Sequence, residues 1–172
     1  MSDNLVIITK VINEHQAIRE HVKLVGDSIS DQEALMSLIS ARADWIPGQL
    51  DLTKRREGLQ KTISLLAEGL KNHFAFEENA LPPLLGELFM QALKLEHSEI
   101  TKAINEVKSI LADTKLEGLS REELILKQSG IREMVDSICQ LVEEHAAKEE
   151  TILEMLRKAL EDRETKSEGW LP

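Results

Sequence analysis

The sequence contains no tyrosine, and only 3% of its residues are aromatic. The lack of tyrosine excludes tyrosyl-radical chemistry and phenolate ligation of a metal. Helix breakers are also scarce, with 4 prolines and 8 glycines in 172 residues. Since leucine, glutamate, alanine, lysine and isoleucine are the abundant residues, the composition predicts an all-helical protein.

Cysteine and long apolar runs are nearly absent as well. The single Cys139 excludes an internal disulfide. The N-terminal stretch lacks the basic start, apolar middle and small-residue cleavage site of a secretory signal, so we expect a cytoplasmic protein. Apolar runs fall well short of the roughly 20 residues that cross a bilayer, and we expect no membrane span.

Positive charge is limited to 21 lysines and arginines, against 31 acidic residues, for a net charge of -10. Nucleic acid and anionic membranes both require clustered positive charge. We therefore expect neither as a partner.

The breakers divide the chain into four helical regions with short connections, which predicts an up-down-up-down antiparallel four-helix bundle. One domain is expected over residues 1–165, with a C-terminal tail at 166–172. The expected helical regions are 4–25, 51–79, 85–112 and 120–162. The first has a possible break at Gly26-Asp27, and its extension to Asp44 is left open. The second ends before Pro82-Pro83, and the fourth begins with a Ser120/Glu123 capping box.

His97 in the third region and His145 in the fourth are expected to lie at the same level of the bundle, and this constrains how the fourth region begins. About 15 residues follow His97 in the third region, whereas about 25 separate Ser120 from His145. We predict that residues 120–130 form a separate turn or overhang as an extended helix end.

Each helix carries one apolar stripe at roughly 3.5-residue spacing, interrupted by a histidine or a His-x-x-x-Glu pair. The expected core positions are Leu5, Ile8, Ile12, His15, Ile18, Val22 and Val25; Leu59, Ile63, Leu66, Leu70, His73, Glu77, Ala80 and Leu84; Met90, Leu93, His97, Ile100, Ile104, Val107 and Leu111; Ile131, Val135, Ile138, Val142, His145, Glu149, Ile152 and Leu156.

The interruptions form an internal repeat. EHQAI (14–18) followed by HFAFEENAL (73–81) corresponds to EHSEI (96–100) followed by HAAKEETIL (145–153). A two-helix unit is therefore present twice, and a pseudo-two-fold axis would bring two half-sites face to face.

Two carboxylates and four imidazoles in a core need compensation, because burying a charge costs several kcal/mol. A buried network of His-Glu hydrogen bonds would explain one pair, but two pairs plus a histidine on each remaining helix favour metal binding. Six nitrogen and oxygen ligands exceed one four-coordinate zinc and suit iron or manganese, which predicts a dinuclear site. The Glu-x-x-His motif of ferritin-type proteins is absent at all five histidines.

The order H, HxxxE, H, HxxxE resembles the hemerythrin-like (HHE cation-binding) domain family over roughly residues 5–160. The resemblance implies a hemerythrin-like bundle with a non-haem di-iron centre bridged by an oxo or hydroxo group. By resemblance, one iron would be held by His15 and His73, the other by His97 and His145, and both would be bridged by Glu77 and Glu149. Manganese or zinc are expected substitutes.

Three further residues are candidates for supporting the ligands. Oxygen-carrying hemerythrins have a fifth histidine one turn after the third-helix histidine, where this chain has Thr101, which argues against reversible oxygen carriage. Glu78 and Glu150, next to the expected ligands, are candidates for orienting an imidazole. His21 falls about 240 degrees around the helix from His15 and is expected at the surface.

The leading hypothesis is a protein that reacts with or senses oxygen, nitric oxide or peroxide, in oxidative or nitrosative stress defence or in repair of iron centres. The alternatives are an iron-responsive regulatory module with an unknown protein partner and a metal-sequestering protein without turnover. The residues leave open whether the chain is an enzyme.

Overall fold

The computed structural model describes residues 3–41, 50–113 and 119–168 of the chain. Their secondary structure is helical, as the composition predicts. The helices are α1 (Asp3–Ala41), α2 (Leu50–Ala80), α3 (Pro82–Leu85), α4 (Glu87–Asp113) and α5 (Arg121–Glu168).

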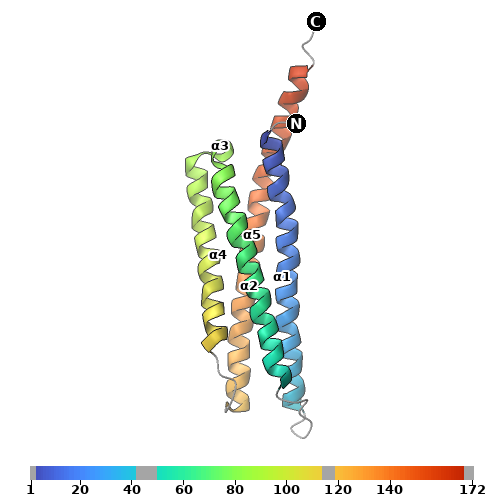
Figure 1. The fold of residues 1–172 in the computed structure, drawn as a ribbon, viewed down its shortest axis with the longest axis vertical. Helices are drawn as coiled ribbons and strands as arrows, with labels where there is room; N and C mark the ends of the chain where they lie inside the picture. Colours follow the sequence, from blue (N-terminus) through green and yellow to red (C-terminus); the bar gives the residue numbers. More distant parts are fainter. Residues whose placement is uncertain (1–2, 42–49, 114–118, 169–172) are drawn as a thin grey trace.

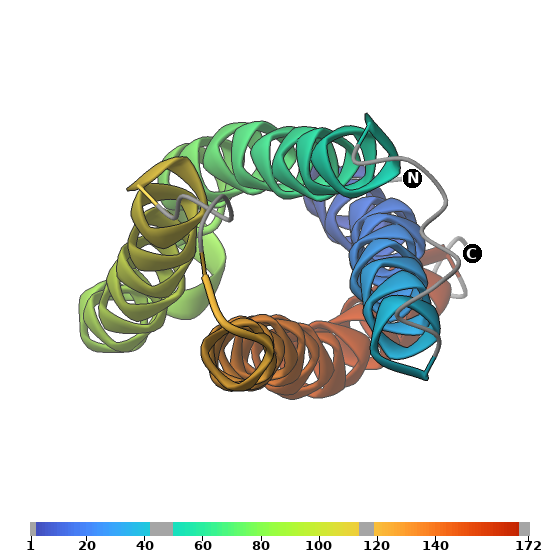
Figure 2. The ribbon, with the colours of Figure 1, turned by 90° about the horizontal axis from the view of Figure 1, so that it is seen from below.

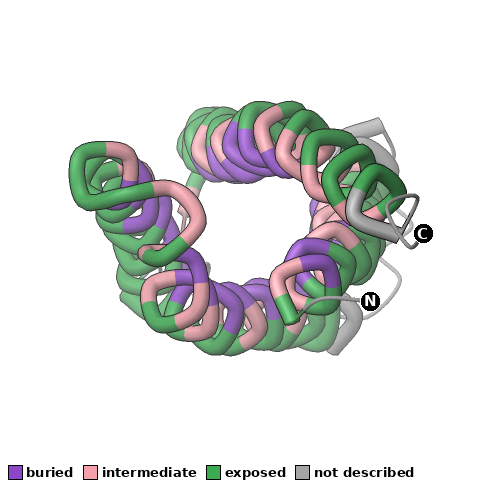
Figure 3. The backbone as a smooth tube through the Cα atoms, turned by 90° about the horizontal axis from the view of Figure 1, so that it is seen from above, coloured by how far each residue is buried: buried purple, intermediate pink, exposed green. Residues whose placement is uncertain are grey.

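The four long helices form an up-down-up-down bundle (Figure 1). Seen end-on, α1 and α4 lie diagonally opposite, and each is flanked by α2 and α5 (Figure 2). The buried positions face the bundle axis on all four helices (Figure 3). The predicted architecture is therefore confirmed, and the repeat unit α1–α2 faces the unit α4–α5.

Two predicted helix ends can be compared with the structure. Helix α1 continues past Gly26 to Ala41, which is the longer of the two alternatives left open, because the roughly 1 kcal/mol cost of one helical glycine is small beside the packing of a long amphipathic face. The fourth region was expected to end near Asp162, but α5 continues to Glu168 and includes the start of the expected tail. The predicted break at residues 46–48 lies outside the described residues, as do most of the 113–119 loop and residues 169–172.

The connection between α2 and α4 contains a helix that the sequence analysis missed. Pro82 and Pro83 occupy the first positions of α3, where a missing N–H costs nothing. Gly86 ends α3 at φ 77°, a backbone region that favours glycine, and its N–H donates to the Pro82 carbonyl. This tight turn sends α4 back beside α2.

The capping box at the start of α5 is confirmed. The Ser120 N–H donates to Glu123 Oε2 at 2.8 Å, and the Glu123 N–H donates to Ser120 Oγ at 3.3 Å. From there α5 runs unbroken, and its first turns extend beyond the end of α4 (Figure 1). Residues 120–130 therefore overhang as an extended helix end, one of the two predicted outcomes.

Two apolar clusters fill the bundle, one on each side of a polar layer. The larger includes Ile18, Leu70, Ile100 and Val142, and the smaller includes Ile8, Leu81, Met90, Leu93 and Leu153. All seven core positions predicted for α4 are buried. In the smaller cluster, Val11, Leu81 and Leu153 are buried where the sequence favoured Ile12, Ala80 and Ile152, which are only half-buried.

Within the described residues, no helix combines the length and apolar character needed to cross a bilayer.

Candidate metal centre

The polar layer is made of the four histidines and two glutamates that interrupt the predicted stripes. Helix α1 places His15, α2 places His73 and Glu77, α4 places His97, and α5 places His145 and Glu149; all six are buried. Each lies one helical turn from apolar neighbours on the same face, so the amphipathic pattern that forms the bundle also brings these side chains together.

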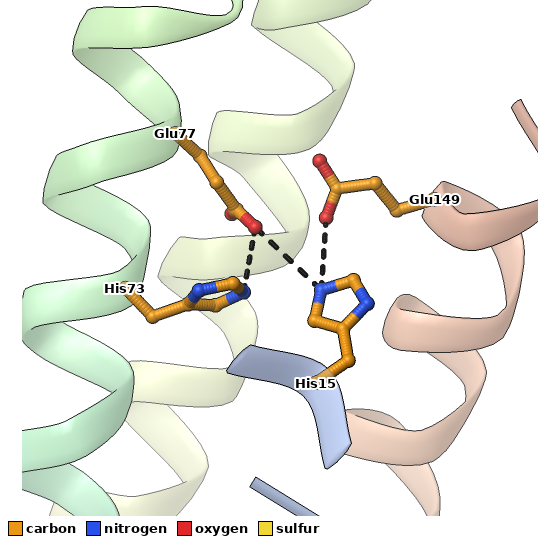
Figure 4. Close-up of side chains that lie close together, drawn as sticks. All are labelled: His15, His73, Glu77 and Glu149. Atoms are coloured by element: carbon orange, nitrogen blue, oxygen red, sulfur yellow. Dashed lines mark ion pairs between the residues drawn. The ribbon is translucent and has the colours of Figure 1, made fainter. Parts of the chain in front are cut away.

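The six side chains fall into two groups that share Glu77. In one group, ligand atoms of His15, His73, Glu77 and Glu149 all lie within 4.8 Å of one another (Figure 4). In the other, atoms of Glu77, His97 and His145 meet the same limit. The structure thus groups His15 with His73 and His97 with His145, and the binding of one ion by each pair stays a prediction.

Glu77 lies at the centre of the layer. Its Oε1 is 2.6 Å from His73 Nε2 and 3.6 Å from His15 Nε2, and its Oε2 is 3.2 Å from His97 Nε2. Glu77 therefore faces imidazoles from both groups, which is the geometry that a bridging carboxylate requires.

Glu149 also faces both groups, at longer distances. Its Oε2 is 3.3 Å from His15 Nε2 and 3.7 Å from His145 Nε2. The two carboxylates come from diagonally opposite helices, α2 and α5 (Figure 2), and their oxygens approach each other within 4.8 Å (Figure 4).

The outward nitrogen of every imidazole is bound by a carboxylate. The Nδ1 atoms of His73, His145 and His97 lie 2.8, 3.0 and 2.9 Å from carboxylate oxygens of Glu14, Glu96 and Glu78. His15 Nδ1 lies 3.2 Å from Glu150 Oε1. Since an ionised carboxylate only accepts, each Nδ1 carries a proton and donates, which leaves each Nε2 to bind a cation, either a second proton or a metal ion.

The inward atoms, in contrast, have no hydrogen-bond partner of suitable geometry among the described residues. They are the Nε2 atoms of all four histidines and both oxygens of Glu77 and Glu149. Eight buried acceptors that point at one another repel unless cations, either protons or metal ions, lie between them. This is the donor set of a cation site, with hard oxygen and imidazole nitrogen atoms and no thiolate.

Without metal, the layer holds protons unevenly. Burial by itself would lower the pKa of His15, but Glu149 and Glu77 outweigh it and raise that pKa to about 9. Burial raises the pKa of Glu149 to about 7, with the neighbouring Glu77 carboxylate adding to the shift and His15 opposing it. Burial would also raise the pKa of Glu77, but the imidazoles of His15, His73 and His97 hold it well below its usual range. Glu77 is therefore the ionised carboxylate and Glu149 the one that takes up a proton first.

Several residues next to the six buried side chains were considered as supports for the imidazoles. Glu78 contacts His97 and Glu150 contacts His15, and their expected role in orienting a ligating imidazole stays a prediction. Glu14 and Glu96 were missed, although the repeat itself carries the signal, because EHQAI and EHSEI both begin with glutamate. Thr101 is exposed one turn from His97 and forms no hydrogen bond with the described site residues, so its role stays a prediction. His21 is exposed, as expected.

Comparison with known proteins gives one match. The family model for the hemerythrin HHE cation binding domain matches residues 6–156. Among curated proteins and among solved structures, none matches this chain.

Proposed function

Because the chain belongs to the hemerythrin HHE cation-binding domain family, we propose that its polar layer holds two iron ions that react with or sense nitric oxide, oxygen or peroxide. The observation that carries the proposal is the set of eight inward acceptors left without partners in a buried layer. Two cations offset the carboxylates and occupy the Nε2 lone pairs, whereas one cation would leave part of the set uncompensated.

The residues proposed to hold the ions are His15 and His73 on one side and His97 and His145 on the other, with Glu77 and Glu149 facing both. Bound iron would supply redox chemistry and coordination positions for small ligands. Manganese or zinc are proposed substitutes, since nitrogen and oxygen donors alone do not fix the metal.

The chain itself prepares the site in two ways. The outer carboxylates fix the tautomer of each imidazole and raise the basicity of its Nε2, which strengthens any bond to a cation. The apolar clusters above and below exclude water, so charges within the layer interact more strongly than they would in solvent.

The test is metal analysis of protein purified from iron-supplemented cells, together with its absorption spectrum. We expect about two metal ions per chain, chiefly iron, with charge-transfer absorption in the near ultraviolet. A stoichiometry near one, or metal-free protein, would contradict the proposed centre. Titration with nitric oxide and peroxide then separates the alternatives: spectral change with consumption supports ligand chemistry, and an inert iron form supports a metal store.

Metal binding is expected to release more protons at lower pH. His15, with a pKa of about 9, is still protonated at pH 8, while Glu149, with a pKa of about 7, joins it at pH 6. The number released should therefore rise from about one at pH 8 to about two or more at pH 6, and apparent affinity should fall as pH falls. Anaerobic calorimetry with Fe²⁺, in buffers of different ionisation enthalpy, measures this number. An equal number at both pH values would contradict the assignment.

The predicted cytoplasmic location remains part of the proposal, and fractionation of cells that express the full-length chain would test it.

A further inference from the structure

The two halves of the repeat differ beside the polar layer, first where α1 meets α5. Arg19 follows His15 by one turn and crosses to α5, where its Nη1 and Nη2 donate to Glu150 at 2.7 and 3.1 Å and its Nε donates to Glu143 at 2.9 Å. Glu150 also accepts from His15. This Arg19 clamp covers the outer side of the layer at the α1–α5 interface.

The equivalent clamp is missing where α2 meets α4. In the repeat, Arg19 corresponds to Thr101, and Glu143 corresponds to Lys71. The short Thr101 side chain therefore takes the place of the Arg19 guanidinium, and the positively charged Lys71 takes the place of the Glu143 carboxylate. In place of the clamp, a groove of about 1280 Å³ lies between α2 and α4, and Thr101, Lys71 and Glu78 line it.

Phe74 lies where this groove meets the polar layer. Its ring lines the groove and stacks on His97, with 3.9 Å between ring centroids and 9° between planes, and meets His145 edge-on at 5.6 Å. Its counterpart in the repeat is Ala146, so only one half of the site has an aromatic side chain here. His97 also lines the groove, so the groove reaches the edge of the layer at the point where the Phe74 ring lies against two imidazoles.

The groove is lined by unpaired positive charge in a chain whose net charge is -10. Two of its acidic residues are engaged, Glu78 with His97 and Glu106 with Lys102. The remaining charged residues are Glu68 and three lysines that form no ion pair within the described part of the chain, namely Lys71, Lys94 and Lys108. Lysines at the rim of a groove raise the local concentration of anions and speed their entry.

We propose that the groove between α2 and α4 is the entrance to the centre, that Phe74 controls passage through it, and that its lysines admit small inorganic monoanions such as nitrite or azide in addition to the neutral ligands of the proposed function. This inference rests on the proposed metal centre for its destination. The groove, its charge and the missing clamp are features of the chain itself, so they are testable without metal.

The charge of the groove is tested by thiol accessibility in a Cys139→Ser background. Ala75→Cys places a thiol in the groove, and Ala147→Cys is its matched control, because each alanine lies two residues after its histidine and is exposed. We expect the ratio of rates with an anionic and a cationic methanethiosulfonate reagent to be about five-fold or more higher at Ala75→Cys. Equal ratios at the two positions would overturn the anion preference.

The entrance is tested by building the missing clamp. The double variant Lys71→Glu/Thr101→Arg recreates the Arg19 arrangement across α2 and α4, and we expect it to slow azide binding to the iron-loaded protein by about ten-fold or more, measured by stopped-flow absorbance. Phe74→Ala should speed the same step.

The outcomes separate the two proposals. If the iron-loaded native protein, the clamp variant and Phe74→Ala all bind azide at the same rate, the proposed entrance is wrong, while the proposed metal centre still stands. Protein that binds no metal would overturn the proposed function and, with it, the destination of the groove, and the thiol ratio would then report only on the charge of the groove.

Discussion

Replacing Glu77 by glutamine is expected to lower bound metal from about two ions to below one per chain and to weaken binding by well over about 100-fold. The two Glu77 oxygens face imidazoles of both groups, so losing its charge affects both ions at once. Loss of an outer partner of a ligating histidine typically costs only about 10–100-fold. Metal content and competition with a chelator of known affinity provide the measurement.

Glu78→Gln is the matched control for this prediction, because Glu78 is the next residue along α2 and contacts only the outer nitrogen of His97. The Glu78→Gln variant should lose metal affinity only by the about 10–100-fold expected for the outer partner of a ligating histidine. Glu149→Gln should resemble Glu77→Gln, since Glu149 also faces imidazoles of both groups. Equal losses for Glu77→Gln and Glu78→Gln would show that Glu77 is not a shared ligand.

The double variant Glu77→Leu/Glu149→Leu is expected to be more stable than the metal-free native chain, by about 1–4 kcal/mol in the free energy of unfolding. Metal-free native protein must bury two carboxylates whose oxygens lack hydrogen-bond partners. Leucine has a similar volume and continues the apolar clusters on either side, although the four imidazole Nε2 atoms stay unpaired. Denaturant unfolding in the presence of a chelator measures the difference.

Adding iron should reverse this order of stability. The native chain gains the free energy of metal binding on folding, whereas the leucine variant lacks the shared carboxylates and gains little. Glu78→Leu serves as the control, because it removes a half-buried residue and breaks the His97 contact, and we expect no gain in the metal-free state. A leucine variant less stable than the metal-free native chain would mean that the carboxylates stabilise the fold through protons alone.

The core of α4 was predictable because one regular stripe faces the bundle axis along its whole length, and all seven positions are buried as expected. The three shifted positions, Val11, Leu81 and Leu153, all belong to the smaller apolar cluster. Each shifted residue, like the residue predicted in its place, lies three or four positions after a buried residue of its helix, namely Ile8, Glu77 or Glu149. Positions i+3 and i+4 both lie near the face of residue i, so packing between the helices decides which of the two is buried.

The sequence by itself determined that four helices share a core and that six histidine and glutamate residues meet in it, because helical periodicity fixes which residues share a face. Only the tertiary structure decided which carboxylate binds which imidazole. Glu14 contacts His73 on α2 rather than its neighbour His15, because the carboxylates of one helix reach only the helix packed beside it. The same holds for the open groove. The repeat shows that Thr101 occupies the position equivalent to Arg19, but whether an interface closes depends on the side chains that two helices place together in space.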